Sequence, residues 1–331
     1  MRVVVLMGGR SGEHDISLIS GAAVVDALAT LKHAQLVMTF DRAGGATWRD
    51  PQESTEGSGS MAAAMSAIEG FGADVAFIAM HGSDGEDGRI QGALELLAIP
   101  YQGSGVCASA VCMDKARTKA VYRAHGLPVA EDVVVESAQE ADWQGMAARL
   151  GLPLVLKTAA SGSSVGVEVV QDLSALEARG KALLQTTHSL VVEQWLSGRE
   201  LTVPVLENAD GVAEALPLIE IRPRTNTWFD YEAKYQPGAT EEICPAPIDD
   251  DLASTLRRLG LNAHHALGCR GYSRTDVMLD ANGRPCLLET NTLPGLTPAS
   301  LLPQAAVEAG IAFPELIERL LTRAMAPSGQ P

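Results

Sequence analysis

Residues 3–31 read VVVLMGGRSGEHDISLISGAAVVDALATL. The run from Val3 to Met7 is short, apolar and rich in β-branched side chains, which is typical of a buried strand, and two glycines follow it. From Ser17 to Leu31, apolar residues recur at helical spacing. The stretch therefore predicts a strand, a polar loop and a helix.

The same unit recurs over the first hundred residues. The sequence predicts strands at 35–40 and 74–80, helices at 61–68 and 89–97, and a connection rich in glycine, serine and acidic residues at 43–60. This alternation predicts an α/β fold with a doubly wound parallel sheet, in which ligands bind at the carboxyl ends of the strands. The loops after Met7 and Met80 are therefore candidate sites.

The pattern changes at about Asp114. A helix with three basic residues is followed by short strands that no longer alternate simply with helices, and residues 280–283 form a hairpin signal between two late strands. These weak boundaries predict three lobes, at 1–113, 114–197 and 198–331.

Composition excludes several classes of protein. The chain has 331 residues, 46% hydrophobic and 20% charged, with a mean hydropathy of +0.08, so it is not largely disordered. Its net charge of −16 would repel a phosphate backbone, so no nucleic acid partner is expected. The apolar run before Gly8 is too short for a signal peptide or membrane span, which predicts no membrane partner and a cytoplasmic location. The five cysteines contain no C-x-x-C pair and are expected to be reduced and buried.

Two common nucleotide-binding motifs are absent from the sequence. Met7 stands where a dinucleotide fingerprint requires its first glycine, and no G-x-x-x-x-G-K-[ST] run occurs. A different candidate begins at Lys157, where a strand opens into a run of small residues that ends at Gly166. Backbone N-H groups in such a loop can approach phosphate oxygens, and the lysine adds a positive charge. A mobile surface hairpin is the alternative interpretation.

A third candidate site lies on the late hairpin. Asp276 precedes its turn, and Glu289 and Asn291 follow it on one face of the next strand. Three oxygen ligands on paired strands favour Mg²⁺. Arg274 shares the face of Asp276 and is placed to hold a charged oxygen beside the metal. A solvated strand face with incidental charges is the alternative.

The motifs taken together resemble the D-alanine:D-alanine ligases of the ATP-grasp superfamily, from Gly8 to about Arg323. The matching stretches are GGRSGEHDIS (8–17), HG (81–82) with GEDG (85–88), GSG (103–105), MDK (113–115), GSSVG (162–166), DYEAKY (230–235), RTD (274–276), LETNTLPG (288–295) and SL (300–301). Their joint occurrence in this order is highly specific. The resemblance implies a three-lobed ATP-grasp fold whose two α+β lobes enclose ATP.

The resemblance also implies a reaction. An ATP-dependent ligase would join two D-alanines through a D-alanyl phosphate, for peptidoglycan precursor synthesis, and would act as a homodimer. A ligase for D-serine or D-lactate, or a catalytically silent ATP-binding module, are the alternatives. The implied cofactors are ATP and two Mg²⁺ ions, with Mn²⁺ as a possible substitute.

Site residues follow by resemblance. The residues implied to bind ATP are Lys115, Lys157, Ser163, Glu193, Leu196, Glu200 and Lys234. The implied metal ligands are Asp276, Glu289 and Asn291. The residues implied to bind D-alanine are Glu13, His81, Arg274, Gly295, Ser300 and Leu301. The implied catalytic residues are Glu13, Ser163, Tyr235 and Arg274. For His81, a loop histidine that satisfies local backbone is an equal alternative, and the base for the incoming amine is Tyr235, Ser163 or bulk solvent.

The chain departs from the family pattern at four positions. Thr158 and Ser161 stand where many relatives have proline and an acidic residue, which puts the stiffness of the phosphate loop in doubt. Leu293 and Ala299 replace a serine and a histidine that some relatives have. These last two are expected to lie outside the central group of site residues.

Overall fold

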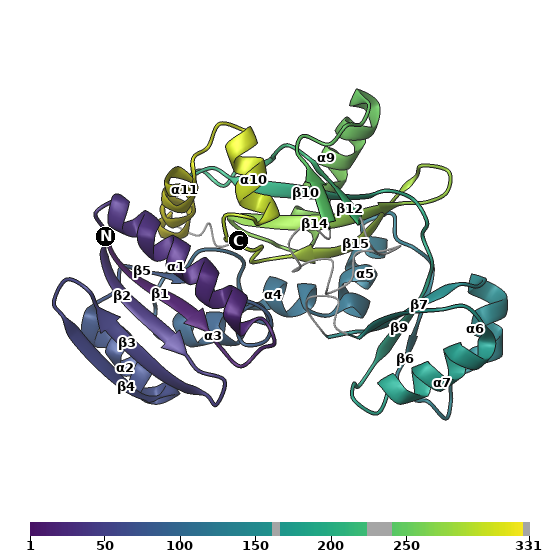
Figure 1. Ribbon diagram of the computed structural model, residues 1–331, viewed down its shortest axis with the longest axis horizontal. Coiled ribbons are helices and arrows are strands. Elements are labelled where there is room, and N and C mark those ends of the chain that lie inside the picture. The colour runs from purple at the N-terminus through teal and green to yellow at the C-terminus, as the bar shows by residue number, and fades with distance from the viewer. Residues whose placement is uncertain (161–165, 224–239, 327–331) are drawn as a thin grey trace.

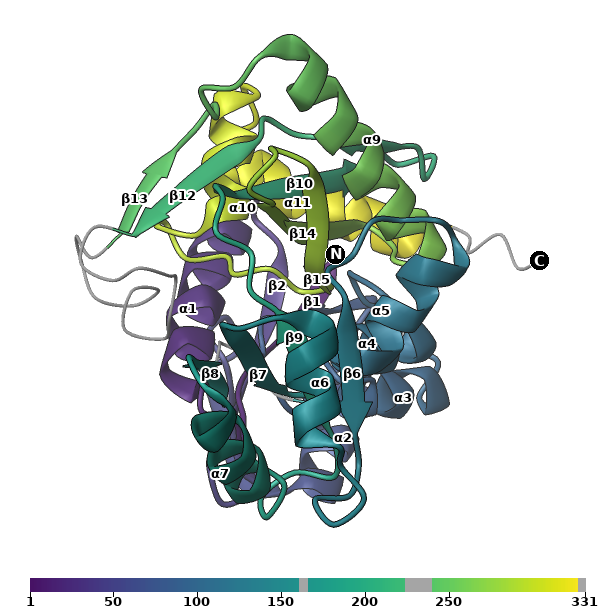
Figure 2. The same cartoon turned by 90° about the vertical axis from the view of Figure 1, so that its right-hand side faces the viewer.

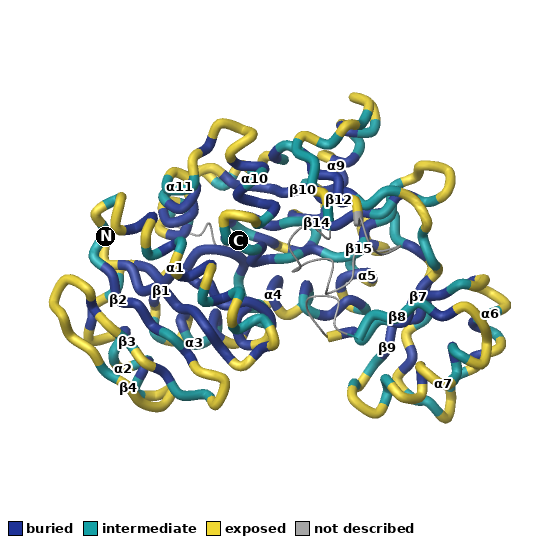
Figure 3. Tube along the Cα trace, in the orientation of Figure 1, coloured by how far each residue is buried: buried dark blue, intermediate teal, exposed yellow. Residues whose placement is uncertain are grey.

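The structure, a computed structural model, describes residues 1–160, 166–223 and 240–326 (Figure 1). Its described strands form three sheets, with helices packed against them. Buried backbone follows the strands, and the exposed backbone lies at loops and outer helix faces (Figure 3). No helix in these described ranges is long and apolar enough to cross a bilayer.

The first sheet has the strand order β4-β3-β2-β1-β5. Its strands are β1 (Arg2–Gly8), β2 (Ala34–Phe40), β3 (Gly45–Asp50), β4 (Thr55–Ser60) and β5 (Val75–Ile78). Strand β1 runs parallel to both of its neighbours, β2 and β5, as the alternating pattern predicts. Their carboxyl ends therefore lie at one edge of the sheet.

The prediction of an unstructured connection at 43–60 is wrong. These residues contain β3 and β4, which extend the sheet as antiparallel strands. Strand β4 reads TEGSGS and is mostly exposed, so it has no apolar alternation by which the sequence reveals a strand. Gly57 is required there because a Cβ would lie 2.5 Å from the Trp48 indole.

Helices cover both faces of this sheet. They are α1 (His14–Thr30), α2 (Met61–Phe71) and α3 (Arg89–Leu96), and α4 (Val106–Cys112) follows α3 and packs against it. Helix α1 lies on one side of the strands, and α2 and α3 lie on the other, in both views (Figures 1 and 2). Gly21 permits the close approach of α1, since a Cβ there would lie 2.6 Å from Met7 side-chain atoms.

The second sheet is antiparallel, with the order β6-β9-β7-β8. It comprises β6 (Asp132–Val135), β7 (Leu154–Thr158), β8 (Val167–Val170) and β9 (Leu190–Gln194), and it packs against α6 (Trp143–Leu150) and α7 (Leu173–Leu183). Helix α5 (Lys115–Ala124) precedes this sheet in the sequence. Its apolar residues pack instead with α9 (Asp250–Ala266), so α5 connects two parts of the molecule.

The third sheet has the order β13-β12-β10-β14-β15, with β11 paired to β10. It comprises β10 (Glu200–Glu207), β11 (Ala213–Ala215), β12 (Ile219–Pro223), β13 (Thr240–Ile243), β14 (Tyr272–Leu279) and β15 (Pro285–Asn291). The last two strands form the hairpin that the turn at 280–283 predicts. Helix α9 covers this sheet, and α10 (Leu301–Glu308) and α11 (Phe313–Met325) follow it.

The C-terminal helices share a core with the first sheet. Helix α11 packs against α1 and β5, and its residues Leu316, Ile317, Leu320 and Leu321 are fully buried in one cluster with β1 and β5. Residues from the predicted first and third lobes therefore form a continuous core. The lobe boundaries at 113/114 and 197/198 stay predictions.

The prediction of five reduced cysteines needs one correction. All five are free in the structure, but only Cys112 and Cys269 are buried. Cys107 is exposed on α4, because the apolar residues around it in the sequence belong to an amphipathic helix with one solvent face.

Candidate active site

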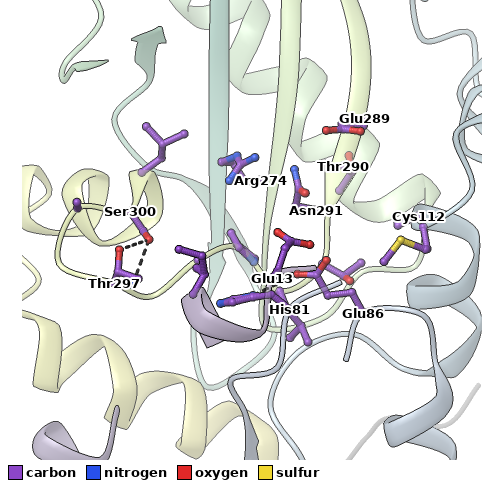
Figure 4. Close-up of a pocket in the computed structure, with 18 of the residues that line it drawn as sticks. Glu13, His81, Glu86, Cys112, Arg274, Glu289, Thr290, Asn291, Thr297 and Ser300 are labelled. Atoms are coloured by element: carbon purple, nitrogen blue, oxygen red, sulfur yellow. Dashed lines mark hydrogen bonds and ion pairs between the residues drawn. The ribbon is translucent and has the colours of Figure 1, made fainter. Parts of the chain in front are cut away.

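The larger of two adjoining cavities, of about 460 Å³, opens where α1, the loop after β5 and the end of β15 meet (Figure 4). It contains all the described residues that the resemblance assigns to D-alanine. These are Glu13, His81, Arg274, Gly295, Ser300 and Leu301. Their convergence follows from the topology, because the loops after β1 and β5 leave the same edge of the first sheet.

A hydrogen bond ties the two loops of the first sheet together. Ser11 Oγ donates to the carbonyl oxygen of His81 at 2.6 Å, and the backbone N-H of Glu13 donates to Ser11 Oγ at 3.2 Å. Gly82 has φ +69°, and a Cβ there would lie 2.7 Å from Glu13 Oε2. A glycine is therefore needed for Glu13 to lie beside the second loop.

His81 is buried between two polar partners. Its Nε2 lies 2.9 Å from Ser20 Oγ and its Nδ1 lies 3.4 Å from Glu86 Oε1. Burial alone would lower the pKa of His81, but Glu86 overcomes this and raises it. Burial raises the pKa of Glu86 itself, against the opposing effect of His81. Glu86 belongs to the matching stretch at 85–88 but was not among the residues assigned to the site from the sequence, although it lines the cavity.

The β14–β15 pairing gathers four polar side chains on one face of the third sheet. Arg274 pairs with Asn291 and Asp276 pairs with Glu289, and directly paired residues project to the same face. A β-bulge follows, since the register shifts between Asp276 and Val277. Figure 4 shows Arg274, Asn291 and Glu289 on this face, with Glu13, His81 and Glu86 nearby.

Asp276 is held from three sides. Arg274 donates to both carboxylate oxygens at 2.9 Å, Thr202 Oγ1 on β10 donates to Oδ1 at 2.6 Å, and Asn291 Nδ2 donates to Oδ2 at 3.3 Å. Burial alone would lower the pKa of Arg274, but Asp276 and then Glu289 raise it above its ordinary value. Arg274 is therefore a permanent cation at the centre of the site.

The donor set on this face fits a hard cation. Asp276, Glu289 and Asn291 offer carboxylate and amide oxygens, which suit Mg²⁺ when phosphate oxygens and water complete the shell. Among the described residues, no group of three or more histidine, cysteine, aspartate or glutamate side chains is placed to hold a metal ion.

A second cavity, of about 100 Å³, lies between the second and third sheets. It is lined by the five described residues that the resemblance assigns to ATP, namely Lys115, Lys157, Glu193, Leu196 and Glu200. Lys157 Nζ donates to Glu193 Oε1 at 2.7 Å. Burial would raise the pKa of Glu193, but Lys157 and then Lys119 lower it, so the carboxylate is charged.

The two cavities meet at an ion pair. Lys115 and Glu289 line both of them, and Lys115 Nζ lies 3.2 Å from Glu289 Oε2. Lys115 is brought there as the first residue of α5, with its backbone N-H bonded to the carbonyl of Ala159 at 2.8 Å. A molecule in one cavity is therefore within reach of a molecule in the other.

The far wall of the larger cavity is the turn before α10. Ser300 is the N-cap residue of α10, and its Oγ accepts a bond from the Thr297 backbone N-H at 3.1 Å (Figure 4). A Cβ on Gly295 would lie 2.7 Å from Ser300 Oγ, so the two segments touch only because residue 295 is glycine.

Three assigned residues, Ser163, Lys234 and Tyr235, lie outside the described residues, as does the departure at Ser161.

The expectation for Leu293 and Ala299 is wrong, because both line the larger cavity. Both residues lie in the segment after β15, which lines the cavity. Their closeness in sequence to Asn291 was therefore the feature from which this placement could have been predicted. Thr158 packs on Gly166, where a Cβ would lie 2.7 Å from its Oγ1.

Known proteins share this architecture. Family models described as D-ala D-ala ligase N-terminus and C-terminus match residues 2–104 and 121–322. A D-alanine-D-alanine ligase of Synechococcus sp. (strain JA-3-3Ab) is 40% identical over 339 residues, covering 99% of this chain and 98% of the relative. The structure of the D-alanine-D-alanine ligase from Coxiella burnetii has a TM-score of 0.82 and 28% identity, covering 98% of this chain and 94% of that one. That of the Bacillus anthracis enzyme complexed with ATP has a TM-score of 0.79 and 29% identity, covering 98% and 97%.

The fold and its two adjoining cavities define an ATP-grasp ligase, which confirms the fold class predicted from the sequence. The matches extend over nearly the whole chain and over both halves of the site. The chain belongs to the D-alanine-D-alanine ligase family.

Proposed function

We propose that this protein joins two D-alanines at the expense of ATP, through a D-alanyl phosphate, and supplies D-alanyl-D-alanine to peptidoglycan precursor synthesis. The observation that carries the proposal is the junction of the two cavities at Lys115 and Glu289. One cavity offers lysines suited to phosphates, and the other offers a carboxylate for an ammonium and Arg274 for a carboxylate. An acyl phosphate forms where these two chemistries meet.

The larger cavity binds both amino acids. Glu13 receives the ammonium of the first D-alanine, and Arg274 with the Gly295 backbone N-H faces its carboxyl group. The carboxylate of the second D-alanine is received by Ser300 and the Leu301 backbone at the start of α10, where a helix N-terminus favours an anion. His81 lies beside this second position.

The smaller cavity binds the nucleotide. Lys115 and Lys157 contact phosphate oxygens, and Glu193, Leu196 and Glu200 hold adenine and ribose. Asp276, Glu289 and Asn291 would hold two Mg²⁺ ions, for which Mn²⁺ is a possible substitute. The ions supply neutralisation of charge on the transferring phosphoryl group. Lys234 and Ser163 complete the proposed set around the phosphates.

Two bond exchanges make up the reaction. A carboxylate oxygen of the first D-alanine attacks the γ-phosphorus, and the bond to ADP breaks. The amine of the second D-alanine then attacks the acyl carbon, the phosphate leaves with the attacking oxygen, and the nitrogen loses a proton to Tyr235, Ser163 or bulk solvent. Arg274 and the Gly295 N-H stabilise the oxyanion of this second step, a type of contact worth roughly 3 to 4 kcal/mol.

Two broader features belong to the same proposal. The enzyme acts as a homodimer, as its resemblance to the family implies. It acts in the cytoplasm, where the ATP that the reaction consumes is available.

Phosphate release tests the proposed function. The protein is incubated with ATP, Mg²⁺ and D-alanine, with L-alanine and no amino acid as controls, and the product is identified by mass. Phosphate release that depends on D-alanine, with an equal amount of D-alanyl-D-alanine, is the expected result. Trials with D-serine and D-lactate beside D-alanine measure the selectivity for the second substrate. ATP binding without dipeptide formation would contradict the proposal.

A further inference from the structure

Lys119 is a buried lysine that lines neither cavity. It lies on α5 behind the smaller cavity, where its side chain is 1% exposed. Its Nζ contacts Glu193 Oε2 and lies 3.0 Å from Asp132 Oδ1. Both carboxylates are as deeply buried, at 3% and 2% exposure, so the three charges form a group closed to water.

The backbone brings the two carboxylates together. Asp132 on β6 and Glu193 on β9 are directly paired across the sheet, where like charges repel. Burying an unpaired charge is costly, so a cation between them is required. Lys119 supplies that cation from the helix, and Arg123, one turn further along α5, also contacts Asp132.

Glu193 divides its two oxygens between two lysines. Oε2 faces Lys119, and Oε1 accepts from Lys157 Nζ, which lines the smaller cavity. Lys119 therefore fixes the rotation of the Glu193 carboxylate and neutralises part of its charge. Without Lys119, the full charge of Glu193 would act on Lys157 and hold its ammonium against the wall.

The contacts of Lys119 also help to fix the position of α5. Lys115 lies one helical turn before Lys119, on the same face, and contacts Glu289 on the third sheet. The same helix face thus contacts both of the sheets that enclose the smaller cavity. A change at Lys119 is transmitted to Lys115 by the shared helix and to Lys157 by Glu193.

We propose that Lys119 is a positioning residue for nucleotide binding, which acts by holding Glu193 so that Lys157 is free to engage phosphate. The inference rests on the proposed function, in which the smaller cavity receives ATP. It assigns a role to a residue that touches no substrate.

The substitution Lys119→Met tests the role, because it removes the ammonium and keeps most of the chain length. Calorimetric titration with Mg-ATP in the absence of D-alanine measures nucleotide affinity without turnover. We expect an increase of about tenfold or more in the dissociation constant and in the KM for ATP, with the KM for D-alanine within about twofold of the wild type. Lys181→Met, which replaces an exposed lysine on α7, is the matched control. It should leave the dissociation constant and both KM values unchanged.

Two more variants separate positioning from folding. Asp132→Asn removes one carboxylate and leaves Lys119 on Glu193, so nucleotide affinity should stay near that of the wild type. Lys119→Met with Asp132→Asn removes one charge of each sign, which keeps the charge balance of the buried group and recovers stability toward heat. This double variant should still bind Mg-ATP weakly, because Glu193 still lacks its lysine.

The pH dependence of affinity provides a second readout. Burial lowers the pKa of Lys119 to about 8, an effect that Glu193 partly opposes and that Lys157 and Arg123 reinforce. The charged groups facing it are these three and Asp132. Loss of its proton removes the same charge as the substitution does, so wild-type affinity should fall above about pH 8 and that of Lys119→Met should not.

The outcomes distinguish this inference from the proposed function. If the wild type fails to bind Mg-ATP, the proposed function is wrong. If the wild type binds and the folded Lys119→Met or double variant binds equally well, the positioning role is overturned. A fall in affinity for ATP and D-alanine together would likewise contradict it, because it would indicate general damage to the fold.

Discussion

At the scale of single residues, Glu289 lies where the two cavities meet. Its Oε2 atom is 3.2 Å from Lys115 Nζ, and its strand partner Asp276 is bound by Arg274. Its carboxylate therefore faces both the proposed phosphates and the proposed acyl group. A change of its charge affects phosphoryl transfer before it affects the binding of either amino acid.

Glu289→Gln should lower kcat by about 100-fold or more, because a neutral amide is a poor ligand for a divalent cation and the charge that faces Lys115 at the junction is lost. Phosphate release at saturating Mg²⁺ measures the effect. Glu177→Gln, an exposed carboxylate paired with Lys181, serves as the control. Near-normal turnover in Glu289→Gln would remove this residue from the proposed metal site.

Glu13→Ala should raise the KM for the first D-alanine by about 10- to 100-fold, the range expected when a charged hydrogen bond to the ammonium is lost. Steady-state kinetics at varied D-alanine, with ATP saturating, measures this change. The control is Asp15→Ala, which removes an exposed carboxylate two residues further along that pairs with Arg42 on the surface. An unchanged dependence on D-alanine would move the ammonium site elsewhere.

At the scale of elements, the β14–β15 hairpin was accessible from the sequence. Alternation placed Arg274 and Asp276 on one face, and the turn at 280–283 brought Glu289 beside them. The bulge after Asp276 and the contact from Thr202 were not accessible. Both depend on backbone register and on a strand some 70 residues away, and neither leaves a local pattern in the sequence.

Thr202→Val tests the contribution of β10 to the site. Valine keeps the shape of threonine but loses the 2.6 Å hydrogen bond to Asp276, so the carboxylate is held less firmly. We expect a loss of about 1 kcal/mol in unfolding free energy and a several-fold weaker affinity for Mn²⁺ in the presence of nucleotide, measured by paramagnetic relaxation of water.

Thr275→Val is its matched control, since Thr275 points to the opposite face and bonds Thr290. It should cost a similar free energy of unfolding without changing the affinity for Mn²⁺. Equal metal affinity in both variants would show that Thr202 is purely structural.

Other elements show why sequence reasoning ended where it did. The polar edge strand β4 was missed, together with its partner β3, because it lacks apolar alternation, whereas the apolar strand β1 and the amphipathic spacing after it were found. Lys119 was seen as one basic residue on a helix, but its carboxylate partners lie 13 and 74 residues further along the chain. Packing between distant segments decides such contacts, and spacing within one segment carries no record of it.

At the scale of the whole molecule, the C-terminal helices hold the third sheet against the first. Glu207 on β10 is at the centre of this joint. Its Oε2 accepts from Arg323 Nε on α11 at 2.6 Å and from the Gly271 N-H at 2.9 Å, and its Oε1 lies 3.0 Å from His264 Nε2. One carboxylate therefore links β10, α9, the start of β14 and α11.

The contribution of Glu207 to the stability of this joint should depend on pH. Burial would raise the pKa of Glu207, but His264, Gly271 and Arg323 lower it to about 2, below its ordinary value of 4.5. Its contribution to stability is therefore present above about pH 4.5 and is lost as the pH falls through 2. Glu207→Gln should reduce the free energy of unfolding by about 2 to 3 kcal/mol at neutral pH, with the difference from the wild type vanishing near pH 2.

Urea unfolding at several pH values measures this difference. Glu315→Gln, an exposed carboxylate on α11 that pairs with Arg319, should change stability by less than about 0.5 kcal/mol at every pH. A difference between Glu207→Gln and the wild type that grows as the pH falls would contradict the assignment.

The central claim is that the carboxyl group of D-alanine is activated by phosphoryl transfer at the junction of the two cavities. Isotope transfer tests it most directly, with D-alanine carrying ¹⁸O in both carboxylate oxygens, unlabelled ATP and Mg²⁺. The account predicts one ¹⁸O in each phosphate released and one ¹⁸O left in the new peptide carbonyl. Phosphate without label, released alongside dipeptide, would contradict the account, because the attacking oxygen would then have come from water.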